Sequence, residues 1–205
     1  MADVSPVFQQ TREVYIERIA SVDWARAAEA LGFATTPAGH DIRLFDRTYT
    51  VAADEISEAD GRPAPFDVLV LLSRYLIMCP ETPDHRLAWT AYRDFKDAGP
   101  LLKYFADNVE GAVASAFSGR RGDLQRAAEG FGGTSPPDPP AYDAAYRFEA
   151  LPRIGMLLLF NDADDEFSAD CRILFERRTE TYLDMECVAI LGARLAAGLF
   201  RGERP

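Results

Sequence analysis

The stretch LLLFNDADDEFSADCRILFE, residues 157–176, holds two apolar runs separated by a short acidic segment. Apolar runs of about four to eight residues between polar segments are typical of buried strands. The sequence therefore predicts strands at 154–160 and 172–175, joined by an acidic hairpin turn. A third strand is predicted at 146–150, which places an antiparallel strand group in the C-terminal quarter of the chain.

Helical spacing of apolar residues surrounds this strand group. It indicates a helix that Asp184 caps and a long amphipathic helix that begins near Pro100 and ends at Gly119. The segment 66–78 is apolar on nearly every face, so we expect a central, buried helix there. Three further helices are predicted: one after Ser5 and Pro6 that continues to Val22, one between Asp23 and Leu31 that Gly32 ends, and one over 123–131.

A change of the apolar period to two marks a second strand group near the N-terminus. The alternating residues are Ile42, Leu44, Tyr49 and Val51. They flank a turn at 46–47, which predicts a small antiparallel meander, and 87–91 is a further extended segment. Because helices stand outside both strand groups instead of alternating strictly with strands, the pattern favours an α+β fold.

We therefore expect two small antiparallel strand groups packed with about five to six helices into a single compact unit. One domain is expected over 1–205, with the N-terminal helix and meander at 5–65 and the remainder at 66–200. A chain of 205 residues with 48% apolar residues can bury a sizeable core without a partner.

Composition and charge exclude several classes of partner and location. Acidic residues outnumber basic ones 33 to 22, a formal charge of −11, so we expect neither nucleic acid nor a membrane as partner. The three cysteines, Cys79, Cys171 and Cys187, are odd in number and far apart, which speaks against a disulfide framework. Because the N-terminus also lacks the pattern of a signal peptide, we expect a cytoplasmic protein; whether any cysteine is redox active is left open.

The acidic segment carries three alternating carboxylates, Asp162, Asp164 and Glu166. Carboxylate oxygens on a turn are ligands that Mg²⁺ and Ca²⁺ prefer, so these residues are candidate metal ligands. An EF-hand loop is excluded because Phe167 and Ile173 stand where glycine and glutamate would be needed. A metal-assisted hydrolase or phosphotransferase is one hypothesis. A solvated hairpin turn, whose acids prevent pairing of strand edges, is the other.

The densest mixture of aromatic and charged residues includes Trp89, Tyr92 and Arg93. These side chains are candidates for a ligand-binding pocket, and the alternative is an edge of the core with one ion pair. A second group, Cys79, Asp84 and His85, offers two or three ligands for zinc or haem but lacks a fourth. The sequence carries no GxSxG motif of a serine nucleophile, no Walker-type loop and no GxGxxG dinucleotide-binding motif that would identify an enzyme or a cofactor.

Several segments resemble a known family in the order in which they occur: FDVLVLLSRYLI, WTAYRDF, EGFGG, LPRIGMLLLFNDADDEFSADCRILFE and YLDMECVAILG. The chain resembles the bacterial and archaeal domain of unknown function 3786. The resemblance covers most of the chain, with the N-terminal helix and meander fitting more loosely, and it implies no assigned activity. It does imply a context in anaerobes, in which some members are joined to a cysteine-rich iron–sulfur module of corrinoid-handling proteins. This chain lacks that four-cysteine module.

The function that these observations favour is a cytoplasmic accessory domain without catalytic activity. Such a domain would bind a protein partner or a small ligand, and the resemblance implies a link to anaerobic redox or corrinoid metabolism. The metal-assisted hydrolase or phosphotransferase that uses 162–166 is the alternative, and a homo-oligomeric scaffold is a third possibility. The cofactor and the oligomeric state stay open.

Overall fold

The computed structural model describes residues 6–52 and 54–202, without the side chains of residues 6–8. The predicted cap at Ser5 therefore lies outside the described residues. The N-terminal part contains, in chain order, α1 (Pro6–Ala20), α2 (Trp24–Leu31), β1 (Ala34–Thr36), β2 (Gly39–Leu44), β3 (Arg47–Val51), β4 (Ile56–Glu58) and α3 (Phe66–Ile77). Strands β1 to β4 form an antiparallel sheet in that order, which we call sheet A.

The C-terminal part is built around a second antiparallel sheet, sheet B, with the strand order β5-β8-β7-β6. Its strands are β5 (Trp89–Ala91), β6 (Ala144–Leu151), β7 (Ile154–Asn161) and β8 (Asp170–Glu176). Its helical segments are η1 (Tyr92–Asp94), η2 (Gly99–Leu101), α4 (Leu102–Phe105), η3 (Ala106–Glu110), α5 (Gly111–Phe117), α6 (Arg121–Gly130), α7 (Thr179–Tyr182) and α8 (Met185–Arg201).

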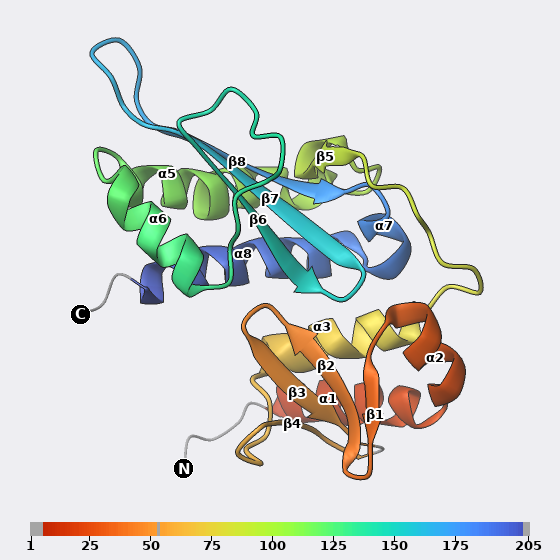
Figure 1. The fold of residues 1–205 in the computed structure, drawn as a ribbon. Coiled ribbons are helices and arrows are strands. Elements are labelled where there is room, and N and C mark those ends of the chain that lie inside the picture. The colour runs from red at the N-terminus through yellow and green to blue at the C-terminus, as the bar shows by residue number, and fades with distance from the viewer. Residues whose placement is uncertain (1–5, 53, 203–205) are drawn as a thin grey trace.

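Figure 1 shows how the two parts are joined. Helix α3 lies between the N-terminal elements and sheet B, while α5, α6 and α8 lie along one side of sheet B. The buried apolar side chains of both parts form one continuous core, and six residues of α3 are buried in it. The α+β class, the two antiparallel strand groups and the compact unit are therefore confirmed. No helix among the described residues is long and apolar enough to cross a membrane.

The C-terminus of α2 ties the two parts together. Gly32, in the left-handed conformation at φ 76°, ends the helix and donates its N–H to the Ala28 carbonyl. The guanidinium of Arg153, from the turn between β6 and β7, donates to the carbonyls of Glu29 and Ala30, both at 3.0 Å. A helix end leaves its last carbonyls unpaired and favours a positive charge, so Arg153 serves both needs.

Tyr75, on α3, completes this junction. Its hydroxyl donates to the carbonyl of Leu31 at 2.9 Å and accepts the N–H of Arg153 at 3.2 Å, although its side chain is fully buried. One phenol group thus pairs two backbone groups from opposite parts of the chain. The junction is consequently polar at its centre, and its hydrogen bonds fix the orientation of α2 toward sheet B.

Two features depart from the predicted elements. The long helix predicted after Pro100 is not uniform: it begins with the single turn η2 and contains a π turn, η3, before α5. The short elements β1, β4 and α7 were not predicted, because three or four residues are too few to show a period. The acidic hairpin between β7 and β8, by contrast, is confirmed by their antiparallel register.

Candidate functional site

A pocket beside the predicted ligand-binding residues Tyr92 and Arg93 lies at a gap in the edge of sheet B. Strand β5 pairs only with residues 174–176 of β8 and ends at Ala91, so in the part of the chain that the structure describes the first half of β8 has no strand partner on that side. Glu110, the last residue of the π turn, occupies the gap. Its carboxylate accepts the N–H of Ile173 at 2.9 Å and so replaces the missing strand.

The resulting cavity has a volume of about 420 Å³, and we call it the edge pocket. Its floor is apolar because Leu159 and Leu174 of sheet B face it, and its rim is charged. The lining residues come from β5, η1, the helix with the π turn, the linker before β6, and sheet B: Ala91, Tyr92, Arg93, Leu102, Phe105, Ala106, Glu110, Tyr142, Leu159, Arg172 and Leu174. Apolar cavities with a few convergent polar groups are the usual form of small-molecule sites.

The electrostatics of the edge pocket centre on Glu110. Burial raises the pKa of this carboxyl, and the hydrogen bond from Ile173 and the positive charges of Arg172 and Arg93 oppose that rise only in part. The two guanidinium groups stay accessible, with side-chain exposures of 43% for Arg172, which lies 3.2 Å from Asp170, and 68% for Arg93, which lies 3.9 Å from Asp94. The pocket therefore offers two cations at its mouth and one half-buried carboxyl that retains a proton more readily than usual.

The structure brings two of the three predicted ligand-binding residues to this pocket. Tyr92 and Arg93 line it, whereas Trp89 lies on β5 opposite Glu176 and is not among its lining residues. Tyr92 is 2% exposed, stacks on Phe105 with 4.3 Å between ring centroids, and donates its hydroxyl to a backbone carbonyl at 3.0 Å. Burial raises the pKa of Tyr92 to about 12. Its ring is thus a fixed wall of the pocket, and ligand binding by these residues stays a prediction.

The acidic turn places its carboxylates on backbone N–H groups. Asp162 accepts the N–H of Gly119 at 2.6 Å, and Asp164 accepts those of Glu166 and Phe167 at 2.8 and 2.7 Å. These hydrogen bonds lower the pKa of Asp164. Among residues 6–52 and 54–202, no group of three or more His, Cys, Asp or Glu is arranged to hold a metal ion.

These contacts favour the hairpin interpretation of the acidic turn, because each bonded carboxylate already stabilises the loop. The metal-assisted alternative stays a prediction, and its test is turnover of a phosphoester. It requires Mg²⁺-dependent hydrolysis by the wild-type protein that the Asp164→Asn variant loses while remaining folded.

The surroundings of Asp84, Cys171 and Cys187 indicate structural roles for these residues. Asp84 is paired with Arg86 at 2.6 Å and accepts a hydrogen bond from Thr181 at 2.7 Å, and the contact with Arg86 lowers the pKa of Asp84. Cys171 and Cys187 are buried, and burial raises the pKa of both thiols. Reactive cysteines need the opposite shift, so the packed interpretation of Cys187 fits its environment better than an activated thiol.

A comparison with models of protein families shows to which family the chain belongs. A model described as a domain of unknown function (DUF3786) matches residues 23–197. The chain belongs to the DUF3786 family. The resemblance is therefore confirmed, and the match includes the N-terminal meander. No curated protein and no solved structure matches the chain significantly.

Two further features of this DUF3786 chain were not found from its sequence. One is a buried charge cluster: Glu176, 1% exposed, lies 2.6 Å from Arg178 and 3.4 Å from Arg147, and it also accepts the N–H of Gly155. The other is a second cavity, of about 300 Å³, between β6 and the turn of β2 and β3. Residues that lie about a hundred positions apart meet there, and no local pattern indicates such a meeting.

Proposed function

We propose that this DUF3786 chain is an accessory domain that binds a small ligand in the edge pocket. The observation that carries the proposal is the meeting of a cavity, two accessible guanidinium groups and a half-buried carboxyl whose pKa burial raises. Perturbed carboxyl groups in pockets are a recurrent mark of functional sites. The volume of about 420 Å³ lies near the lower end of the roughly 300–1,000 Å³ of small-molecule sites.

The lining indicates the chemistry of the ligand. Arg93 and Arg172 favour an anionic group, because guanidinium forks match the geometry of a carboxylate. Leu159 and Leu174 favour a short apolar chain against the floor. Glu110 has a second carboxylate oxygen beyond the one that Ile173 uses, and it favours a hydrogen-bond donor on the ligand. A 2-amino or 2-hydroxy acid with an apolar side chain combines these three features.

The test is a melting-temperature series with matched ligands. Leucine, 2-hydroxyisocaproate, isocaproate and leucinamide share one carbon skeleton. They differ only in the hydrogen-bond donor at C2 and in whether the carboxyl group is a carboxylate or an amide. A ligand at one hundred times its dissociation constant stabilises the folded state by about 2.7 kcal/mol, which corresponds to roughly 5–11 °C for a domain of this size. We expect the first two compounds to stabilise most and leucinamide least.

Variants separate the edge pocket from general charge effects. Arg172→Gln removes one guanidinium from the pocket and is expected to abolish the preference for the carboxylate over the amide. Arg47→Gln is the matched control, because Arg47 is an exposed arginine of sheet A far along the chain that does not line this pocket. If none of the four compounds shifts the melting temperature, or if both variants behave alike, the proposal is wrong.

The finer context is proposed from the family resemblance. We infer a cytoplasmic accessory role linked to anaerobic redox or corrinoid metabolism. The three free cysteines support the part of this proposal that concerns a reducing compartment, and they do not bear on the metabolic link. A corrinoid macrocycle is much larger than the ligand for which we argue, so such a link would act through a protein partner. Purification from the host without oxygen, with an absorption spectrum, and mixing with cobalamins and haem would test it. The absence of any absorbance or melting shift would count against that context.

A further inference from the structure

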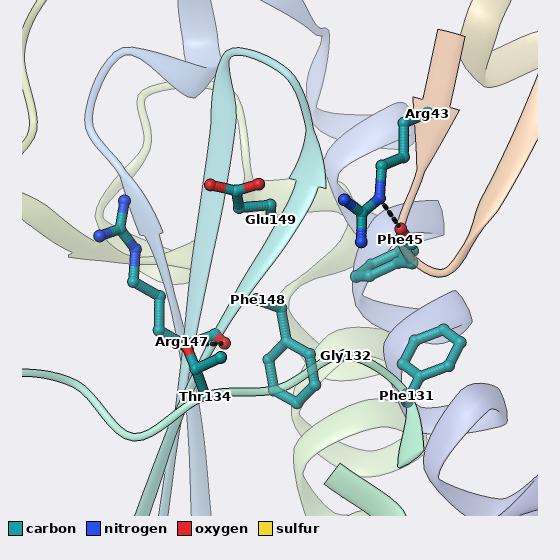
Figure 2. A pocket seen from close by; sticks show the side chains of 8 residues that line it. All are labelled: Arg43, Phe45, Phe131, Gly132, Thr134, Arg147, Phe148 and Glu149. Carbon is teal, nitrogen blue, oxygen red and sulfur yellow. Dashed lines mark hydrogen bonds between the residues drawn. The ribbon is translucent and has the colours of Figure 1, made fainter. Parts of the chain in front are cut away.

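The second cavity lies where the two parts of the fold meet, and we call it the junction pocket (Figure 2). On one side is the turn between β2 and β3, whose Phe45 N–H donates to the carbonyl of Ala150 on β6 at 2.9 Å. On the other side is the loop after α6, where Thr134 and Arg147 exchange two backbone hydrogen bonds. The pocket is therefore framed by three segments that hydrogen bonds hold in place.

Three phenylalanine rings form the apolar wall of this pocket. Phe45 lies 5.0 Å from Phe131, and Phe131 lies 6.4 Å from Phe148, measured between ring centroids. Figure 2 shows these rings on one side of β6, whereas the side chains of Arg147 and Glu149 extend to the other. Phe45, Phe131 and Phe148 are only 4%, 7% and 1% exposed, so a guest can reach only the parts of the rings that line the cavity. The tilted rings favour contact with another aromatic ring there.

The backbone of Phe45 has an unusual conformation that its neighbours hold in place. Phe45 is the one residue other than glycine with a positive φ, 54°, among the described residues. A side chain at such a position is strained, and glycine would relieve the strain. Phenylalanine at this position directs a ring toward Phe131 instead, and the Nε of Arg43 holds the turn by donating to the Phe45 carbonyl at 2.8 Å.

Arg43 supplies a cationic group at the pocket, whose lining also includes Thr134, Arg147 and Glu149. Its side chain is exposed, and within residues 6–52 and 54–202 its two terminal nitrogens have no hydrogen-bond partner. Figure 2 shows the guanidinium beside the Phe45 ring, at the mouth of the cavity. A carboxylate placed there can accept hydrogen bonds from both terminal nitrogens.

We propose that the junction pocket, formed by Arg43 with the rings of Phe45, Phe131 and Phe148, binds a small aromatic carboxylate. The aromatic ring lies against the three phenylalanines and the carboxylate lies on Arg43. The occupant is a free small molecule and not an added peptide strand, because Thr134 and Phe45 already use the outer edge of β6 on both sides of the pocket. This site is independent of the edge pocket and does not rest on the function proposed above.

Nuclear magnetic resonance titration of the full chain with benzoate, phenylacetate and 3-phenylpropionate tests the proposal. Phenylacetamide and cyclohexylacetate are the matched compounds without the charge and without the aromatic ring. We expect the largest shifts at the amides of Gly132, Thr134 and Glu149, and weaker binding of both matched compounds. Shifts absent from these amides with all three acids would overturn the proposal, whatever binds elsewhere.

Variants then assign the contact with the carboxylate. Arg43→Gln is expected to weaken binding of the best acid by about tenfold or more, the factor expected for a lost charge-assisted hydrogen bond, and to leave phenylacetamide unaffected. Arg47→Gln, on the same hairpin, and Arg172→Gln, in the edge pocket, are expected to leave the affinity unchanged. Equal losses in Arg43→Gln and Arg47→Gln, or a loss only in Arg172→Gln, would contradict this site.

Discussion

The hydroxyl group of Tyr75 allows a quantitative test of how the two parts of the chain are joined. In Tyr75→Phe the ring still fills its place, but the Leu31 carbonyl and the Arg153 N–H lose their common partner. An unsatisfied buried polar group costs about 1–3 kcal/mol, so two such groups predict a loss of about 2–6 kcal/mol in unfolding free energy. For a domain of this size that loss lowers the melting temperature by roughly 4–24 °C.

Urea unfolding followed by circular dichroism and by fluorescence measures this loss. Both probes are expected to report one shared transition, as the single domain over 1–205 predicts, with the variant midpoint lower and the slope unchanged. Tyr104→Phe is the control, because Tyr104 is 45% exposed on the surface and its change should be neutral. A Tyr75→Phe variant within about 0.5 kcal/mol of the wild type would refute the reasoning about the junction.

Three further changes test the site and sheet B. Glu176→Gln leaves Arg178 and Arg147 without their carboxylate and should lower the unfolding free energy by about 2–3 kcal/mol in urea; a neutral result would contradict the charge cluster. Gly155→Ala places a Cβ 2.7 Å from Glu176 Oε1 and should cost about 1–3 kcal/mol, whereas a harmless change would show that Glu176 moves freely. Because burial raises the pKa of Glu110, the folded state keeps its proton when the unfolded chain has lost it, so stability falls as pH rises from about 4.3 through the raised pKa. Glu110→Gln should flatten that part of the stability profile against pH, and an unaltered profile would exclude Glu110 as its cause.

Matched controls exist for these changes. Gly130→Ala introduces a Cβ with no atom within 4 Å, so it should not destabilise the protein as Gly155→Ala does. Glu129→Gln alters an exposed carboxylate on α6 and should leave both the unfolding free energy and the pH profile near those of the wild type.

Periodic elements could be predicted from the sequence because their signals are local. The apolar face of α3, the alternation in β2 and β3, and the two runs of β7 and β8 each repeat often enough to identify their type. The caps at Asp23 and Asp184 follow the same logic, since each side chain accepts an N–H of the helix that it begins. Chain order alone did not fix how the two sheets face each other.

The pockets could be predicted only in part. The sequence marks Tyr92 and Arg93 as an aromatic and charged pair. Glu110 and Arg172 join them in the pocket only because Glu110 pairs with Ile173, which is 63 positions away in the chain. The junction pocket depends on the conformation of Phe45, a residue whose identity gives no indication of a positive φ. Trp89 is close to Tyr92 in the sequence but does not line the same pocket, because the chain turns away from β8 after Ala91.

The π turn at Ala106–Glu110 bears on how this chain could tolerate changes of length. A π turn contains one residue more than the α-helical turn that it interrupts, so deletion of a single residue there would restore a regular helix. The same deletion would leave Val113 and Phe117 facing the interior, because the wider turn absorbs the extra residue, and it would shift only the positions of the turn itself, Glu110 among them. Homologues that lack this extra residue should therefore also lack a carboxylate beside the open edge of β8.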